Sequence, residues 1–463
     1  PGPGRSVSPV AVATLFNPGD MTRAELRAYG RASRKKLPRN HHRDWSVPAD
    51  RVDPLDILRQ QDAVRVPELV PIRYGRMLQS PFTLFRGSAA VMAADLASTP
   101  TSGINVQACG DAHVANFGVY ASPERRIVFD INDFDETLPG PWEWDLKRLA
   151  VSLLLDTRDA GWSDDVGLRA IHDCVVRYQT VLDDLSQVST IAIGYEQLDR
   201  RRFLDLYGTK QTVKALAKVI KKANRRTNEQ AVRKWVRHED GIAQFVDEPP
   251  LIEHLPTEQT EEFQRLINRY RSTLQANRRH VLEQYRFRDV ARKVVGVGSV
   301  GLRAYIVLMQ GRGPDDLIVL QAKEAVPSVL SPYWGRSGYR RHGKRVVIGQ
   351  RLMQAASDPF LGWAPFADRD FYVRQLRDHK GPSERLSSAA SYHVDAQVVG
   401  GTLARAHARS VDPAVLRGYI GTSERFATTI TNFAHSYATQ VETDFEQITL
   451  DVQRKGIPIE RGL

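Results

Sequence analysis

Apolar residues along the chain follow a helical spacing in most segments and an alternating spacing in one. The segments with helical spacing lie at 150–155, 166–185, 209–237, 258–285, 343–357, 391–409 and 413–450. The alternating pattern begins at Val294, and two apolar runs, 304–309 and 317–323, flank a polar Gly-Pro-Asp turn. These patterns predict an α+β protein in which a small antiparallel sheet is accompanied by many helices.

One polar stretch, from Cys109 to Ala150, stands out from the apolar pattern. It contains two short predicted strands, Phe117 to Tyr120 and Ile127 to Ile131, and then a helix with Asp145 in its first turn. Polar residues crowd the ends of these strands: Asp111, His113, Asn116, Asp130, Asp133, Asp135 and Glu136. Carboxylates and an amide at strand ends hold divalent metal and orient a hydroxyl. A single Asp-x-His would fit a polar turn better, but the ordered series favours a site.

A second cluster is glycine-rich and is followed by a lysine. Gly296, Gly298, Ser299 and Gly301 precede the predicted hairpin, and Lys323 lies on its returning strand. A dinucleotide-binding fold would place a helix after the glycines, whereas more strand pattern follows here. We therefore expect a glycine-rich hairpin that covers phosphates, with Lys323 beneath it.

Composition and charge narrow the class of protein. The 463 residues are 42% hydrophobic, with a net charge of +11, which favours anionic partners such as nucleotides. The two cysteines, Cys109 and Cys174, exclude a disulfide framework and a cysteine zinc cluster. The sequence shows no membrane-spanning run and no secretory signal, and its opening residues resemble a flexible lead-in, so we expect a cytoplasmic protein without membrane contact.

Two basic features remain open to more than one interpretation. The amphipathic segment 209–237 is expected to be solvated surface, with nucleic-acid binding as a weaker alternative. Arg73, Arg76 and Arg86 lie near the polar stretch in sequence. They fit a phosphate clamp and ion pairing with the acidic cluster about equally well.

The motifs CGDAHVANFG, FDINDFDE and WEWDLKRLA resemble the catalytic core of aminoglycoside phosphotransferases and related kinase-like enzymes. The resemblance implies ATP and magnesium, with Asp111 as the catalytic aspartate and Asn116 as a metal ligand. It implies that either Asp133 or Asp130 is the second metal ligand, and that Asp145 braces the catalytic loop. His113 belongs to the same catalytic motif.

The motif order is the reverse of that in ordinary kinases, because the glycines follow the catalytic motif. The segment TLARAH at 402–407 resembles the helix that normally precedes the catalytic loop. We therefore expect a circularly permuted, bilobal protein-kinase-like fold with a mostly helical large lobe and a small antiparallel-sheet lobe. We expect an N-terminal arm with a peripheral helix at 1–68 and the first part of the large lobe, with a helical insertion (156–280), at 69–284. The small lobe is expected at 285–380, and the helical C-terminal part of the large lobe at 381–463.

One part of the kinase pattern has no obvious counterpart. The helix expected at 344–356 contains no glutamate to pair with Lys323; Gln350 is the nearest polar residue, and Glu324 should point to the opposite face of its strand. We expect an ATP- and magnesium-dependent phosphotransferase acting on a hydroxyl of a small molecule. The alternatives are a nucleotide-binding pseudokinase that regulates a partner and an AMP-transferring enzyme. Most of the chain also resembles a bacterial family of unknown function.

Overall fold

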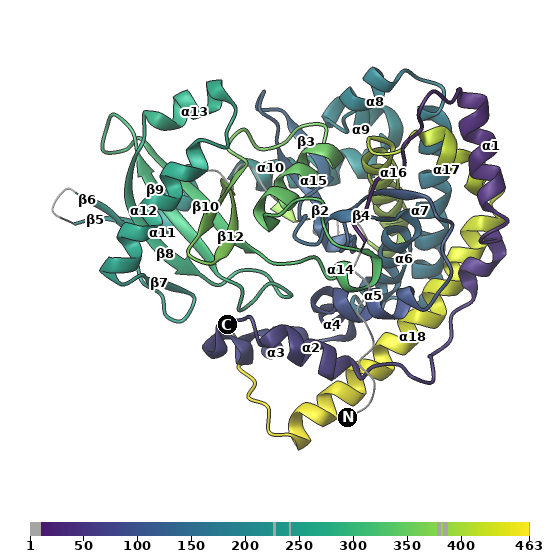
Figure 1. Cartoon of the computed structure of the whole chain (residues 1–463), viewed down its shortest axis with the longest axis horizontal. Coiled ribbons are helices and arrows are strands. Elements are labelled where there is room, and N and C mark those ends of the chain that lie inside the picture. The colour runs from purple at the N-terminus through teal and green to yellow at the C-terminus, as the bar shows by residue number, and fades with distance from the viewer. Residues whose placement is uncertain (1–10, 226–227, 240–241, 377–380, 383–387, 463) are drawn as a thin grey trace.

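The computed structural model describes residues 11–225, 228–239, 242–376, 381–382 and 388–462. It is an α+β protein made of a sheet unit and a larger helical unit, which lie side by side in Figure 1. The opening residues interpreted as a flexible lead-in lie largely outside the described part. None of the described helices combines the length and apolar character needed to cross a membrane.

The sheet unit is built on six antiparallel strands in the order β11-β12-β10-β9-β8-β7. In chain order these strands are β7 (Ile252–His254), β8 (Arg286–Lys293), β9 (Ala304–Gln310), β10 (Leu317–Ala325), β11 (Gly362–Phe366) and β12 (Arg369–Gln375). The expected hairpin is confirmed as β9 and β10, with Leu320 opposite Val307. The loop that carries the glycines, residues 294–303, joins β8 to β9 and is called the glycine loop below.

Alternate residues of each strand face opposite sides of the sheet, and both sides are covered. Val307 and Met309 pack with α12 (Thr257–Arg271) and α13 (Ala276–Glu283). Ile306 and Leu308 pack with a cover formed by three elements, α11 (Asn228–Trp235), β5 (Val236–Glu239) and β6 (Ile242–Phe245). Helices α14 (Ser331–Trp334) and α15 (His342–Met353) follow β10 and lie toward the helical unit in Figure 1.

The sheet unit begins earlier along the chain than the expected boundary at residue 285. Strand β7 and helices α11 to α13, expected as part of a helical insertion in the other lobe, belong to the sheet and its covers. The single helix expected at 258–285 is two helices. The segment 209–237 is likewise divided, into α10 (Lys210–Arg225), α11 and the start of β5, with two undescribed residues between the helices.

The helical unit surrounds α6 (Trp142–Asp159), which is buried along nearly its whole length because apolar residues occupy every side of it. Its neighbours are α7 (Asp164–Leu185), α16 (Tyr392–Ala408) and the long α18 (Arg425–Arg454). Peripheral helices complete the unit: α1 (Arg23–Ser33), α8 (Thr190–Tyr195), α9 (Arg200–Tyr207) and α17 (Pro413–Ile420). Short 3-10 turns lie at Arg39–Arg43, Pro67–Leu69, Val114–Asn116 and Ala389–Ser391.

Two small sheets hold the polar stretch. The predicted strands are confirmed as β2 (Phe117–Ala121) and β3 (Ile127–Ile131), which pair with each other, and β13 (Gly381–Pro382) adds to β2. Strand β1 (Asn105–Ala108) pairs with β4 (Leu138–Pro141). The β1–β4 pair therefore brackets residues 109–137, and α6 begins directly after β4.

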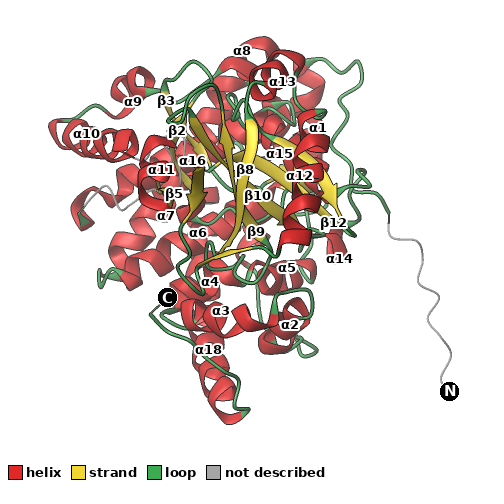
Figure 2. Cartoon of the chain, turned by 90° about the vertical axis from the view of Figure 1, so that its left-hand side faces the viewer, coloured by secondary structure: helices red, strands yellow, loops and turns green. Residues whose placement is uncertain are grey.

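Four helices follow the N-terminal segment and lie next to both units: α2 (Pro54–Asp62), α3 (Val70–Met77), α4 (Pro81–Gly87) and α5 (Ala89–Ala97). Residues 54–62 were expected within a surface arm, but Leu55 and Leu58 of α2 are fully buried. The chain returns to this region at its C-terminal end, where the Glu460 amide donates to the Pro71 carbonyl (3.0 Å). Figure 2 shows that end beside α3.

Candidate functional site

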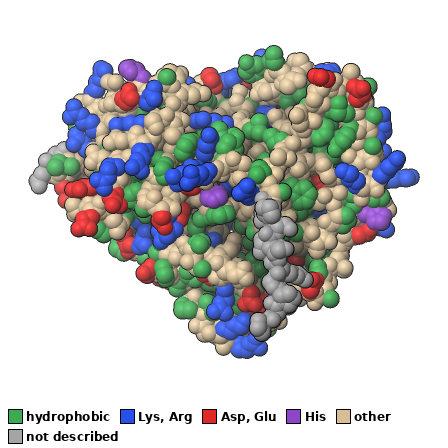
Figure 3. Space-filling model, viewed as in Figure 1, with side chains coloured by type: hydrophobic (Ala, Val, Ile, Leu, Met, Phe, Trp, Pro, Cys, Tyr) green, Lys and Arg blue, Asp and Glu red, His purple; other side chains and the backbone are tan. Residues whose placement is uncertain are grey.

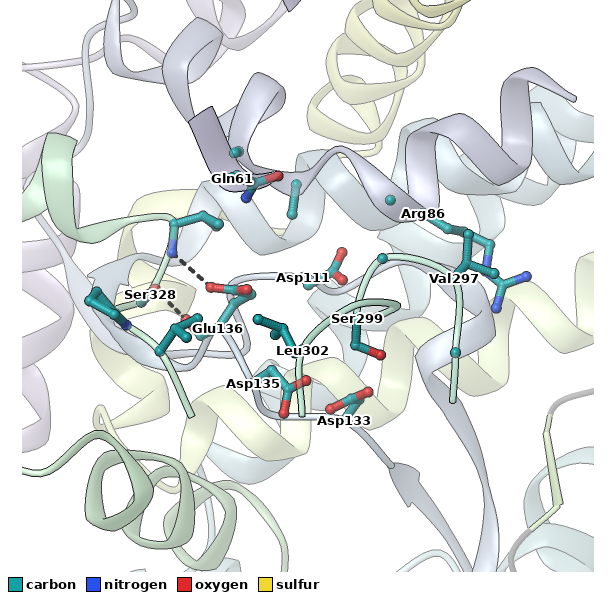
Figure 4. Close-up of a pocket in the computed structure, with 18 of the residues that line it drawn as sticks. Gln61, Arg86, Asp111, Asp133, Asp135, Glu136, Val297, Ser299, Leu302 and Ser328 are labelled. Carbon is teal, nitrogen blue, oxygen red and sulfur yellow. Dashed lines mark hydrogen bonds between the residues drawn. The ribbon is translucent and has the colours of Figure 1, made fainter. Parts of the chain in front are cut away.

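A cavity of about 390 Å³ lies where the polar stretch, the glycine loop and helices α2, α4 and α5 meet. The predicted site residues that line it are Asp111, His113, Asn116, Asp133, Gly296, Gly298 and Ser299. Figure 4 shows Asp111, Asp133 and Ser299 around one hollow. Segments about 180 residues apart in sequence therefore meet at one cavity. Three predicted site residues, Asp130, Gly301 and Lys323, do not line it.

The loop that carries Asp111 and Asn116 is held by Asp145, which lies in the first turn of α6 as predicted. The two carboxylate oxygens of Asp145 accept from the backbone amides of Cys109 (2.6 Å) and Gly110 (2.9 Å). His407, near the end of α16, lies 3.2 Å from the same carboxylate. Gly110 has a φ of 79°, which disfavours any residue with a side chain. The loop conformation is thus fixed from α6 and α16.

Asn116 and Asp111 are joined within this loop, because Nδ2 of Asn116 donates to the Asp111 carbonyl (2.8 Å). The Asp111 carboxylate accepts from Nε of Arg148 in α6 (2.6 Å), and Nε2 of His113 lies 3.8 Å from it. Burial lowers the pKa of His113 to about 4, although Asp111 opposes the shift. His113 is therefore neutral at pH 7.

Lys323 meets the acidic segment (residues 130–136) instead of the cavity. Its ammonium forms an ion pair with Asp135 and lies 3.6 Å from Asp133. The Tyr372 hydroxyl, opposite Lys323 on β12, donates to Asp135 (2.7 Å). Burial disfavours the charged ammonium, but the carboxylates of Asp133 and Asp135 outweigh it and raise the pKa of Lys323.

The structure separates Asp130 from Asp133, which the sequence left as alternatives. Asp133 lines the cavity. Asp130 is 7% exposed, lies outside the cavity lining and accepts from the Ile131 amide (2.9 Å). Burial raises the pKa of Asp130, with Arg409 and Arg405 opposing the shift. Asp133 is thus the aspartate of this pair that can meet a ligand in the cavity.

Glu136 is a further carboxyl group at the cavity, on the side away from Asp133 in Figure 4. Its carboxylate accepts from the Val329 amide (2.7 Å), and its backbone carbonyl accepts from the Ser328 hydroxyl (2.7 Å). Burial raises the pKa of Glu136 to about 7. The sequence marked this residue only as a member of the acidic cluster.

The glycine loop is held in place by N-terminal helices. The Gly301 carbonyl accepts from the Val66 amide (2.8 Å), and the Gly296 carbonyl accepts from Nη1 of Arg76 (2.6 Å). A Cβ added to Gly298 would lie 3.1 Å from the Arg86 carbonyl, so a side chain at this position would crowd the α4 backbone. The loop therefore closes over the cavity against α4.

Helix α15 contains no glutamate and supplies an arginine to the acidic segment. Nη2 of Arg345 donates to the carbonyls of Asp135 (2.7 Å) and Val326 (2.8 Å). Gln350, the nearest polar residue by sequence, donates to Gln354 just after the end of the helix (3.0 Å). Glu324 faces the other side of β10, as expected, and pairs with Arg369 (2.7 Å).

The three arginines near the polar stretch have different surroundings. Arg73 is fully buried and binds Asp62 and Gln61 of α2, and Arg76 binds the glycine loop. Arg86 lines the cavity. Gln61 of α2 and Arg65, which follows this helix, also line it, although no motif or periodicity in the sequence marks either residue as part of a site.

Within the described residues, no group of three or more His, Cys, Asp or Glu side chains is arranged to hold a metal ion. Asp133 and Asn116, however, both line the cavity. Magnesium commonly takes only one or two protein carboxylates and completes its shell with water and substrate phosphates. The oxygen donors present fit magnesium that arrives with a nucleotide.

The net positive charge of the chain is not gathered at one place on the face shown in Figure 3. Lys and Arg side chains are spread over both units there, with acidic side chains among them. The apolar side of α10 packs into a local core through Leu216 and Ile220. Nucleic-acid binding by residues 209–237 stays a prediction.

Fold and site together define an α+β protein with an acidic cavity beneath a glycine loop. The chain belongs to a family described as "Uncharacterized protein conserved in bacteria (DUF2252)", which matches residues 65–450. No curated protein and no solved structure matches it.

Proposed function

We propose that this protein is a magnesium- and ATP-dependent phosphotransferase that acts on a hydroxyl group of a small molecule. The observation that carries the proposal is that Asp111, Asn116 and Asp133 line one cavity beneath the glycine loop. Phosphoryl transfer requires positioning and charge stabilisation more than covalent chemistry, and this set of groups supplies both.

The arrangement of the two units supports a circularly permuted kinase-like fold. The end of α16 and the start of the catalytic stretch are neighbours in space, because the Gln107 amide donates to the Ser410 hydroxyl (2.8 Å). His407 and Asp145 also connect α16 to the catalytic loop. In an unpermuted chain, a short connection from α16 to β1 would place the helix directly before that loop.

Each residue has a role that its position allows. Asp111 accepts the proton that the acceptor hydroxyl loses as its oxygen bonds to the terminal phosphorus of ATP and ADP leaves. Asn116 and Asp133 would hold magnesium, which neutralises phosphate charge when bound. The glycine loop offers backbone amides to the phosphates because it lacks side chains at Gly296 and Gly298.

The cavity favours a small acceptor over a protein chain. Residues of α2 and α5, including Ile57 and Ala90, form part of the wall of the cavity that Asp111 also lines. A cavity of about 390 Å³ is at the lower end of the range for small-molecule sites. The acceptor must fit between this wall and Asp111.

The test is ADP release from ATP and magnesium across a panel of hydroxyl-bearing metabolites. Asp111→Asn should lower turnover by about 100-fold or more on any accepted substrate, because the proton acceptor is lost. Asp165→Asn, at an exposed position of α7, is the matched control and should retain turnover. Equal turnover in Asp111→Asn and the control would rule out the proposed role of Asp111.

The second candidate is a nucleotide-binding protein without turnover. One observation favours it. The Lys323 ammonium is paired with Asp135 and does not face the cavity, and α15 contains no glutamate that could pair with Lys323 in place of Asp135. Tight ATP binding without any product, unaffected by Asp111→Asn, would support it. If a product does form, its mass distinguishes transfer of phosphate from transfer of AMP.

A further inference from the structure

A phosphate-binding cavity needs a cation that faces it, and Lys323 does not fill that role in this structure. Its side chain is 4% exposed, its ammonium is bound by Asp135 and lies near Asp133, and it is absent from the cavity wall. Within the described residues, the basic side chains that line the cavity besides His113 are Arg65 and Arg86.

Arg65 is already engaged by protein groups. Its Nη1 donates to the Val300 carbonyl of the glycine loop, and its Nε lies 3.9 Å from Asp62. Its side chain therefore helps to hold the glycine loop.

Arg86, in the last turn of α4, has no hydrogen bond or ion pair from its side chain within the described part of the chain. Its Nε is buried without a hydrogen-bond partner, and its nearest aromatic neighbour is the Phe82 ring, 5.8 Å from Cζ. Figure 4 shows its guanidinium beside Val297 of the glycine loop. Burying a guanidinium nitrogen without a hydrogen-bond partner is unfavourable, so this half-buried side chain is suited to an anion that enters the cavity.

Asp111, Asp156 and Asp159 lie within electrostatic range of Arg86, but none of them forms an ion pair with it within the described part of the chain. Asp111 accepts from Arg148 (2.6 Å), and Asp156 accepts from the Tyr392 hydroxyl (2.6 Å). Ion pairing within the acidic cluster, one of the two roles considered for Arg86, is thus not what the structure shows. The cation stays available to a ligand.

We propose that Arg86 binds phosphate oxygens of the nucleotide under the glycine loop, and that it provides the cavity-facing positive charge that Lys323 does not. This assignment rests on the proposed phosphotransferase function for its ligand. A guanidinium binds two phosphate oxygens at once, which also orients the phosphate. Because the glycine loop packs against the Arg86 backbone at Gly298, loop and cation are positioned together.

The test is calorimetric titration of the full chain with inorganic tripolyphosphate, without magnesium, and separately with magnesium-ATP. Arg86→Gln should weaken binding of both ligands by at least about tenfold, because charge-assisted hydrogen bonds are lost. Arg86→Lys should bind with intermediate affinity, since it keeps the charge but not the paired donors. Arg265→Gln, which removes the same charge from an exposed position, should bind like the wild type.

Tripolyphosphate binding by Arg86→Gln within twofold of the wild type would overturn the assignment, as would the absence of binding to the wild-type protein. If Arg86→Gln does not fold, the tripolyphosphate affinity of Arg86→Lys is the test. An affinity equal to that of the wild type would then count against the proposal. ADP release is measured on the same samples. Arg86-dependent tripolyphosphate binding with no ADP release on any acceptor would refute the phosphotransferase and leave Arg86 as an anion ligand.

Discussion

The ammonium of Lys323 on β10 forms a buried ion pair with Asp135 of the acidic segment, 188 residues earlier in the chain. Asp135 also accepts from the Tyr372 hydroxyl, and its carbonyl accepts from Arg345 of α15. The sheet unit, α15 and the polar stretch therefore meet at one residue, Asp135. Asp135 is thus the carboxylate that neutralises the buried Lys323 ammonium most directly.

Removing one member of this ion pair should destabilise the fold. Asp135→Asn leaves the buried Lys323 ammonium without its closest counter-ion and should lower the free energy of unfolding by about 3 kcal/mol. Urea denaturation measures this loss. The double variant Asp135→Asn/Lys323→Met should lose less than the sum of the two single variants, and strict additivity would contradict the coupling.

The bracing by Asp145 of the loop that carries Asp111 gives a second prediction. Asp145→Asn replaces one acceptor with an amide that cannot accept from both the Cys109 and Gly110 backbone donors. We expect a loss of about 2 kcal/mol in unfolding free energy, as for hydrogen bonds to a charged group. Asp165→Asn serves as the surface control, and equal stability of the two variants would show that the brace is unimportant.

Magnesium dependence should separate Asp133 from Asp130. Asp133→Asn removes a carboxylate from the cavity wall, so the magnesium concentration for half-maximal ADP release should rise by about tenfold or more. Asp130→Asn should leave that concentration unchanged, because Asp130 does not line the cavity. A titration of both variants with magnesium checks this. A higher magnesium requirement in Asp130→Asn, with none in Asp133→Asn, would assign the metal to Asp130.

Acid should destabilise the protein through His42, which is fully buried and hydrogen-bonded to the Tyr419 hydroxyl (2.7 Å). Burial, with Lys147 and His41, lowers the pKa of His42 well below 6.5. The unfolded chain then binds a proton below pH 6.5 that the folded chain does not, so stability is lost as pH falls.

Between pH 7 and pH 5 the contribution of His42 amounts to about 2 kcal/mol. His42→Gln cannot titrate, and its unfolding free energy should fall less over this range than that of the wild type. Denaturant unfolding at both pH values gives the comparison. Identical losses in the two proteins would mean that His42 is protonated in the folded state.

The sequence alone determined the local elements of the site and its chemical types. Periodicity predicted β2, β3, the β9–β10 hairpin and α6, because side-chain alternation and helical spacing are local properties. The motifs marked Asp111, Asn116 and the glycine loop as candidate site residues, although the sequence shows no contact between them. They also placed Asp145 at the start of a helix, where it braces the loop that carries Asp111.

Only the tertiary structure decided which of these residues share a cavity. It placed Asp133 at the cavity wall and Asp130 away from it, although the two lie three residues apart. It gave Lys323 a partner in Asp135 and brought Gln61, Arg65 and Arg86 to the cavity lining. The physical reason is that a charge in a folded chain finds its partners through packing of distant segments, and sequence spacing does not encode that packing.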